Sequence, residues 1–157
     1  TVWLDSITKD LTSVDLSEQM LEIAKQKVNS SQVQFHVANL LEPWTFTKGN
    51  YDLVVCSLML EHIEDLKLMF QKISATTEKG AQLYIGELHP FKQYAGSKAR
   101  FETEQGIQVV PCFTHHISDF TEAAFANGFK LLIFKEFFDL GDTKQIPRLL
   151  CLVFEKL

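Results

Sequence analysis

The sequence has few cysteines, little glycine or proline, and no long run of apolar residues or of one charge. Its 157 residues include only 7 glycines, 4 prolines and 3 cysteines, and it contains no repeat or Gly/Ser-rich linker. Hydrophobic residues make up 46% of the chain. This length and composition suit one domain with a sizeable core and are too short for two full domains, so we expect a single domain over residues 1–157.

Each absence excludes a class of environment or partner. No apolar run reaches the roughly 18 residues that a helix needs to span a bilayer, and no segment resembles a signal peptide. Cys56, Cys112 and Cys151 lie far apart without metal-binding spacing, which favours reduced thiols in a soluble, cytoplasmic protein. The net charge of -5 without a basic block disfavours nucleic acid and membrane partners. No feature indicates an oligomeric state.

Strand-like and helix-like patterns alternate along the chain. We expect strands over residues 11–15, 33–37, 51–57, 81–88, 129–138 and 149–154, and helices over 17–28, 66–74 and 118–127. The last two strands are separated by a short connection containing Gly141 and Pro147, which favours an antiparallel pair. The pattern predicts an α/β fold: a doubly wound, Rossmann-like, mostly parallel sheet with helices on both faces and a C-terminal antiparallel strand.

The regular pattern fades between residues 89 and 116. Pro90, Gly96, Gly106 and Pro111 interrupt a segment that is rich in polar and aromatic residues. We therefore expect a variable insertion there.

Asp15 is the first residue whose position points to chemistry. It ends a predicted strand just before a predicted helix. Open α/β sheets bind ligands at the carboxyl ends of their strands, and an acid there can accept hydrogen bonds from the vicinal hydroxyls of a ribose. An acid at a helix N-terminus or in a turn would look the same, so position alone leaves both interpretations open.

Three segments carry a family resemblance. Residues 14–25, beginning Val-Asp-Leu-Ser, resemble the second-strand acidic motif of class I S-adenosylmethionine-dependent methyltransferases, particularly their small-molecule "type 11" group. Residues 35–43 and 51–62 resemble later motifs of the same family, in the same order. The resemblance covers residues 11 to about 90 well and the tail more loosely. It implies methyl transfer from S-adenosyl-L-methionine to a small-molecule acceptor by in-line displacement, with S-adenosyl-L-homocysteine as product.

The resemblance also implies roles for individual residues. Asp15 would hold the ribose, and Asn39, which replaces the family's usual aspartate, would accept from the adenine amine through its amide oxygen. Asn39 could instead cap a turn before Pro43. The candidate cofactor-binding residues are Asp5, Asp15, Leu16, Asn39, Leu40, Ser57 and Leu58, the last two beside the methionine moiety. Met20 is left out because apolar residues at such spacing are more often core.

The segment after the fifth strand of the family pattern concentrates cationic, polar and aromatic groups. By resemblance it builds the acceptor pocket or lid, over residues 89–116. Our candidates for acceptor binding are Glu87, Tyr94 and Arg100, and those for a general base are His62, His89 and His115. Each can equally be a structural, packing or solvated residue. If Arg100 and the histidines line the pocket, an acceptor with a carboxylate or an acidic hydroxyl is favoured. His115 and His116 are adjacent and lack spaced partner ligands, so no metal is expected.

One family feature is missing. Thr1–Asp5 resembles the family's first strand, but residues 6–10 lead directly into the next strand without the glycine-rich loop. Neighbouring parallel strands need a crossover of a dozen or more residues, which these five cannot supply. Either the protein is shortened here or the sequence lacks residues between Asp5 and Ser6. We favour the second interpretation, since an unliganded glycine-rich loop is a plausible site of disorder. A truly absent loop would favour a non-catalytic binding module, and a nicotinamide-dependent oxidoreductase is a further alternative.

Overall fold

The chain forms two compact units, Thr1–Lys48 and Gly49–Leu157, each with its own sheet. The computed structural model describes residues 1–28, 30–47, 49–96, 100–103, 106–109, 111–139, 141 and 146–157, with the backbone alone for 100–103 and 106–109. None of the helices in these ranges is long and apolar enough to cross a membrane. The single domain expected from the chain length stays a prediction.

The first unit is built around one β-α-β crossover. Strands β1 (Leu11–Asp15) and β2 (Val33–Val37) pair in parallel, and helix α2 (Glu18–Lys27) connects them. The helix begins where the sequence predicts, because the hydroxyl of Ser17 accepts a hydrogen bond from the backbone N–H of Met20 at 3.3 Å. Both strands coincide with their predicted ranges. Asp15 is therefore placed at the carboxyl end of a parallel strand.

The first five residues correct the sequence analysis. Residues Val2–Asp5 form a single helical turn, α1, and not a strand. The backbone N–H of Asp5 donates to the carbonyl of Thr1, and that of Ser6 donates to Trp3, so Asp5 and Ser6 lie in one continuous turn. Residues 6–10 are too few for a parallel crossover, and a helical turn removes the conflict. That residues are missing between Asp5 and Ser6 stays a prediction.

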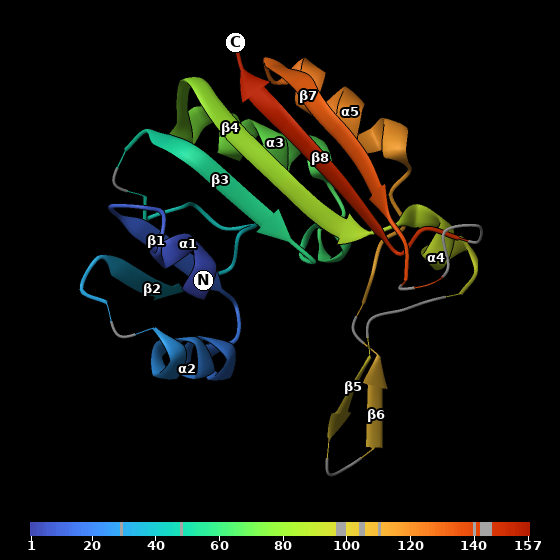
Figure 1. Ribbon diagram of the computed structural model, residues 1–157, viewed down its shortest axis with the longest axis horizontal. Helices are drawn as coiled ribbons and strands as arrows, with labels where there is room; N and C mark the ends of the chain where they lie inside the picture. Colours follow the sequence, from blue (N-terminus) through green and yellow to red (C-terminus); the bar gives the residue numbers. More distant parts are fainter. Residues whose placement is uncertain are drawn as a thin grey trace. The chain divides into compact units, whose positions relative to one another are not determined.

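The second unit contains a four-stranded mixed sheet in the order β3-β4-β8-β7 (Figure 1). Its strands are β3 (Tyr51–Ser57), β4 (Thr77–Leu88), β7 (Phe129–Phe137) and β8 (Leu149–Lys156). Strands β3 and β4 are parallel, whereas β8 runs antiparallel to both of its neighbours, β4 and β7. The predicted C-terminal antiparallel strand is thus confirmed, and it is inserted between two strands of the opposite direction.

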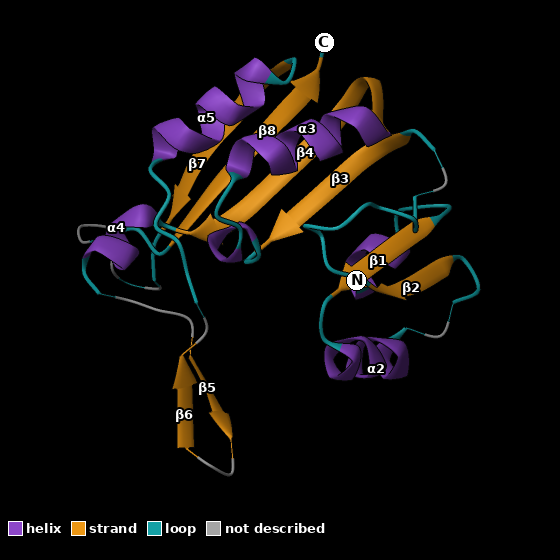
Figure 2. Cartoon of the chain, turned by 180° about the vertical axis from the view of Figure 1, so that it is seen from behind, coloured by secondary structure: helices purple, strands orange, loops and turns teal. Residues whose placement is uncertain are grey.

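Helices α3 (Leu66–Thr76) and α5 (Ile117–Ala126) pack on the same face of this sheet (Figure 2). Phe70 of α3 is fully buried and meets Phe129 and Phe154 edge to face, with ring centroids 6.5 and 6.3 Å apart. Helix α5 ends at Ala126, and Gly128 just beyond it has a φ of 78°, the left-handed conformation that glycine commonly supplies after a helix. The core of the unit lies between the two helices and the sheet.

The segment expected to be irregular contains short regular elements. Helix α4 (Pro90–Tyr94) follows β4 directly, and strands β5 (Arg100–Thr103) and β6 (Gly106–Val109) form an antiparallel hairpin. Outside this segment, just beyond β3, residues Leu60–His62 also form a short element, a turn of 3-10 helix, η1. Elements of three to five residues are too short to show a hydrophobic period, which is why the sequence does not reveal them.

Replacing Phe70 with alanine should lower the free energy of unfolding by about 3–5 kcal/mol, because it opens a cavity among buried rings. Urea denaturation followed by circular dichroism measures the loss. Phe125 lies on α5 and is 54% exposed, so Phe125→Ala is the matched control and should change stability by less than about 0.5 kcal/mol. Equal losses for the two variants would contradict this assignment of the core.

Candidate functional site

In the first unit, the candidate ligand-binding groups lie where β1 ends. One carboxylate oxygen of Asp15 accepts a hydrogen bond from the backbone N–H of Ser17 at 2.8 Å. A carboxylate has about four acceptor positions, so Asp15 retains capacity for further donors such as ribose hydroxyls. The next residue, Leu16, is 71% exposed, so its side chain is accessible to a ligand.

Asn39 and Leu40 follow β2 in the same unit. The side-chain oxygen of Asn39 accepts from the backbone N–H of Leu41 at 3.0 Å, so the turn-capping alternative is realised. An amide oxygen has a second lone pair, and Asn39 is exposed, so this turn leaves one acceptor position for an adenine amine. The carbonyl of Leu40 accepts from the indole N–H of Trp44 at 2.9 Å, which fixes the loop backbone.

Asp5 differs from its expected setting. It ends the helical turn α1 and not a strand, and its carboxylate and backbone carbonyl accept from the side-chain amide of Gln32 at 3.0 and 2.9 Å. The acid of the family's first strand therefore has no geometric counterpart at Asp5. This correction follows from the missing crossover.

In the second unit, the chain turns sharply after β3. Ser57 and Leu58 are both exposed and border a cavity of about 240 Å³, which is also lined by Tyr84, Gly86, Phe137, Leu149, Leu150 and Cys151. Leu58 has a φ of 50°, a left-handed conformation that is costly for a residue other than glycine. Its N–H donates to the carbonyl of Gly86 at 2.8 Å.

Glu87, near the end of β4, is almost fully buried, with 2% of its surface exposed. Its Oε1 accepts from the backbone N–H groups of Met59 and Leu60, both at 3.0 Å. Oε2 is buried and has no hydrogen-bond partner among the described residues. Burial raises the pKa of Glu87, and the nearby Glu61 carboxylate raises it further. The backbone N–H groups that donate to the carboxylate lower this pKa, but each by less than burial raises it. An acceptor molecule has no access to this carboxyl group as the structure stands.

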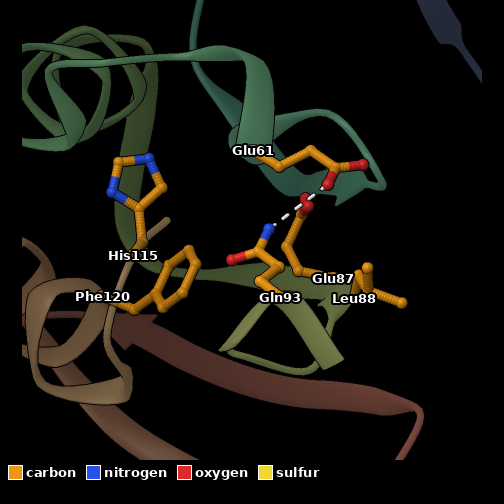
Figure 3. Close-up of a pocket in the computed structure, with 6 residues that line it drawn as sticks. All are labelled: Glu61, Glu87, Leu88, Gln93, His115 and Phe120. Carbon is orange, nitrogen blue, oxygen red and sulfur yellow. Dashed lines mark hydrogen bonds between the residues drawn. The ribbon is translucent and has the colours of Figure 1, made fainter. Parts of the chain in front are cut away.

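Several polar groups gather around Glu87. Figure 3 shows the Glu61 and Glu87 carboxyl groups and the Gln93 amide directed toward one another, and the Gln93 amide donates to Glu61 at 3.3 Å. His115 borders the same small space and hydrogen-bonds the carbonyl of Ile63 through Nε2 at 2.7 Å. Sequence analysis missed Glu61 and Gln93. The available signal for Glu61 was its place just beyond β3, beside the end of β4.

The three candidate histidines have different environments. His89 is fully buried between two partners: its Nδ1 accepts from the N–H of Phe91 at 3.2 Å and its Nε2 meets Glu136 at 2.9 Å. His115 is 8% exposed. The side chain of His62 is 34% exposed, with Nδ1 at 3.0 Å from the carbonyl of Pro111. His62 alone of the three keeps a ring edge open to solvent.

The remaining acceptor candidates are separated from this cluster. Tyr94, 51% exposed, makes a short hydrogen bond from its hydroxyl to Nδ1 of His116, a residue outside the original candidates. Arg100 begins β5, and its side chain lies outside the described residues.

Glu61, His62 and Cys112 each place one potential metal-ligand atom within 4.8 Å of the others. Two of these side chains already serve neighbours, because Glu61 accepts from Gln93 and His62 bonds Pro111. The expectation that no metal binds stays a prediction. None of the three cysteines is in a disulfide, and burial followed by the effect of Glu87 raises the pKa of Cys56 to about 12, which keeps that thiol protonated.

Comparison with known sequences agrees with this geometry. Residues 1–85 match the methyltransferase-domain family. A ubiquinone biosynthesis O-methyltransferase of Coxiella burnetii is 26% identical over 161 residues, covering 92% of this chain and 68% of the relative. A protein of the same name from Xanthomonas oryzae is 26% identical over 116 residues, which cover 73% of this chain and 48% of the Xanthomonas protein.

Solved structures share the fold. A putative S-adenosylmethionine-dependent methyltransferase from Listeria monocytogenes has a TM-score of 0.82 at 18% identity, and the match covers 98% of this chain and 83% of the Listeria chain. The DhpI complex with S-adenosylhomocysteine has a TM-score of 0.73 at 16% identity, and the match covers 99% of this chain and 70% of the DhpI chain. The fold is thus the α/β, Rossmann-like methyltransferase fold with antiparallel C-terminal strands. Since the family match spans more than half of the chain, this protein belongs to the class I S-adenosylmethionine-dependent methyltransferases.

Proposed function

We propose that this protein transfers the methyl group of S-adenosylmethionine to an oxygen atom of a small molecule that carries a carboxylate or an acidic hydroxyl. The observation that carries the proposal is Asp15, an acid with spare acceptor capacity at the carboxyl end of a parallel strand, within the family's acidic motif. The name of the Coxiella relative supports oxygen as the methylated atom.

Each unit, taken by itself, offers residues that suit one part of the cofactor. In the first unit, Asp15 would bind the ribose hydroxyls and Asn39 the adenine amine, with exposed Leu16 and half-buried Leu40 beside the ring. In the second unit, Ser57 and Leu58 would lie beside the methionine moiety, where they border the 240 Å³ cavity. When bound, the cofactor supplies the electrophilic methyl group. Positioning is the main task left to the chain.

The carboxylate of the cofactor is the group that fits least well. The family's glycine-rich loop would present backbone donors to it, and this sequence has no glycine before Gly49. We therefore propose no residue of this sequence for the cofactor's carboxylate. A protein truly without the loop would instead suit the alternative function, a non-catalytic binding module.

His62 is the proposed general base. Its Nδ1 faces the carbonyl of Pro111, which an N–H there would satisfy, and its Nε2 lies 3.9 Å from Oε1 of Glu61, beyond hydrogen-bond distance, so Nε2 would carry the lone pair. Nε2 would take the proton of an acceptor hydroxyl while the hydroxyl oxygen bonds to the methyl carbon and the bond from that carbon to the sulfonium sulfur breaks, which leaves S-adenosylhomocysteine. His89 and His115 are too deeply buried, and too fully engaged with neighbours, for this task in the structure.

S-adenosylhomocysteine should bind in a calorimetric titration, and NAD should not. Asp15→Asn should weaken the binding at least about tenfold, because hydrogen bonds to a charged group contribute roughly 1.5–3 kcal/mol. Asp10, exposed near the other end of β1, provides the control Asp10→Ala, which should leave the affinity unchanged. Binding of NAD instead would favour the oxidoreductase, and binding of neither would favour the non-catalytic module.

His62→Asn should lower kcat with 3,4-dihydroxybenzoate by about 10²–10⁴-fold, the usual contribution of a general base. The affinity for S-adenosylhomocysteine should stay as in the wild type, because His62 serves the acceptor. Formation of S-adenosylhomocysteine, followed by mass spectrometry, measures the rate. An unchanged kcat would remove His62 from the mechanism.

Arg100→Ala should raise KM for 3,4-dihydroxybenzoate, which has a carboxylate for the guanidinium to bind. KM for catechol, which has the same hydroxyls without the carboxylate, serves as the control and should not change. Equal KM values for wild type and variant with the first acceptor would count against Arg100 as an acceptor-binding residue.

A further inference from the structure

The turn after β3 holds an unfavourable backbone conformation at the place where the proposed function puts the methionine moiety. Leu58 is the one residue other than glycine with a positive φ among the described residues, at 50°. Such a conformation persists only when surrounding contacts determine it, and it is often found at ligand sites. The contacts that determine it come from the end of β4.

Two successive residues of β4 hold this turn. The carbonyl of Gly86 accepts from the N–H of Leu58 at 2.8 Å. Oε1 of Glu87 then accepts from the next two N–H groups, those of Met59 and Leu60, at 3.0 Å each. Three consecutive backbone donors are thereby bound to one strand end, so the turn has little freedom to relax.

We propose that Glu87 is a positioning residue that fixes the turn of residues 57–60 and thereby sets the affinity for S-adenosylmethionine and its product. The inference rests on the proposed function, since it takes Ser57 and Leu58 as the residues that border the cofactor. Glu87 itself touches no ligand, because it is buried beneath the turn.

The strand register explains why a glutamate at this position can reach the turn. Ser57 of β3 pairs with Gly86 of β4, so Glu87 stands one residue beyond the last paired position of β3. Glu87 pairs with the fully buried Leu150 of β8, and the side chains of two directly paired residues lie on the same face of the sheet. The hydrogen bond to the N–H of Leu60 is buried, so withdrawal of the carboxylate would leave that donor without an acceptor.

The same turn anchors the acceptor-side segment. The carbonyl of Glu61 accepts from the N–H of Phe113 at 2.7 Å, and the carbonyl of Ile63 accepts from His115 at 2.7 Å. Gln93 of α4 donates to the Glu61 carboxylate. Residues 57–63 therefore connect the proposed cofactor contacts to the proposed acceptor segment, and Glu87 fixes their first half.

Two substitutions separate reach from charge. Glu87→Asp keeps the charge but withdraws the carboxylate by one methylene, and it should weaken S-adenosylhomocysteine binding at least tenfold. Glu87→Gln loses the charge but keeps an oxygen at the same reach, and it should restore affinity to within about threefold of the wild type. Wild-type affinity in a folded Glu87→Asp variant would overturn the proposal, as would an equal loss in Glu87→Gln.

A double-mutant cycle tests whether Glu87 acts through Leu58. Glycine adopts a positive φ without strain, so in a Leu58→Gly background the turn needs less support. Glu87→Asp should then cost less than threefold in affinity. The same tenfold loss in both backgrounds would show that Glu87 does not act through this turn.

Hydrogen exchange distinguishes a failure of this inference from a failure of the proposed function. If the wild type binds no S-adenosylhomocysteine, the proposed function fails, and the role of Glu87 is read from the amides of Met59 and Leu60 alone. These amides should exchange as slowly as those of β4 in the wild type and in Glu87→Gln. Exchange at the rate of an open loop in either protein would overturn the inference. This measurement needs only the wild type and Glu87→Gln, so it also tests the inference if Glu87→Asp does not fold.

Discussion

The parallel pairing of β3 with β4 is the constraint on which the second unit depends. Parallel strands end at the same edge of a sheet, and the register that joins Ser57 to Gly86 brings the residues after one strand beside the last residues of the other. Glu87 can then accept from the turn that follows β3, although 27 or 28 residues separate the partners. A shift of one residue would turn Glu87 to the opposite face and leave that turn without its acceptor.

The antiparallel strand β8 completes this arrangement. It lies between β4 and β7, so its fully buried Leu150, Leu152 and Phe154 face the helices beside the buried residues of β4. His89, directly after β4, reaches Glu136 of β7 across the end of β8. The histidine that sequence analysis offered as a base thus serves to join two strands that do not pair with each other.

Much of the fold was predictable because its elements are long enough to show a period or a clear boundary. Tyr51–Ser57 is nearly all apolar, and Ser17 and Gly128 mark a helix start and a helix end. Burial of individual polar side chains was not predictable, since it depends on contacts between distant segments. Glu87 and His115 were expected to meet an acceptor, yet tertiary packing encloses both, whereas Asp15 and Leu58 lie at strand ends that the sequence pattern alone located.

The corrected start of the chain shows how a negative result from sequence can be informative. The five residues between Asp5 and Leu11 are too few for a parallel crossover, and the structure resolves the conflict with a helical turn in place of a first strand. Ligand contacts by Ser57 and Leu58 would demand a rigid turn, because a preorganised contact loses less entropy on binding. The burial of an acid beneath that turn, despite its desolvation cost, is consistent with such a demand.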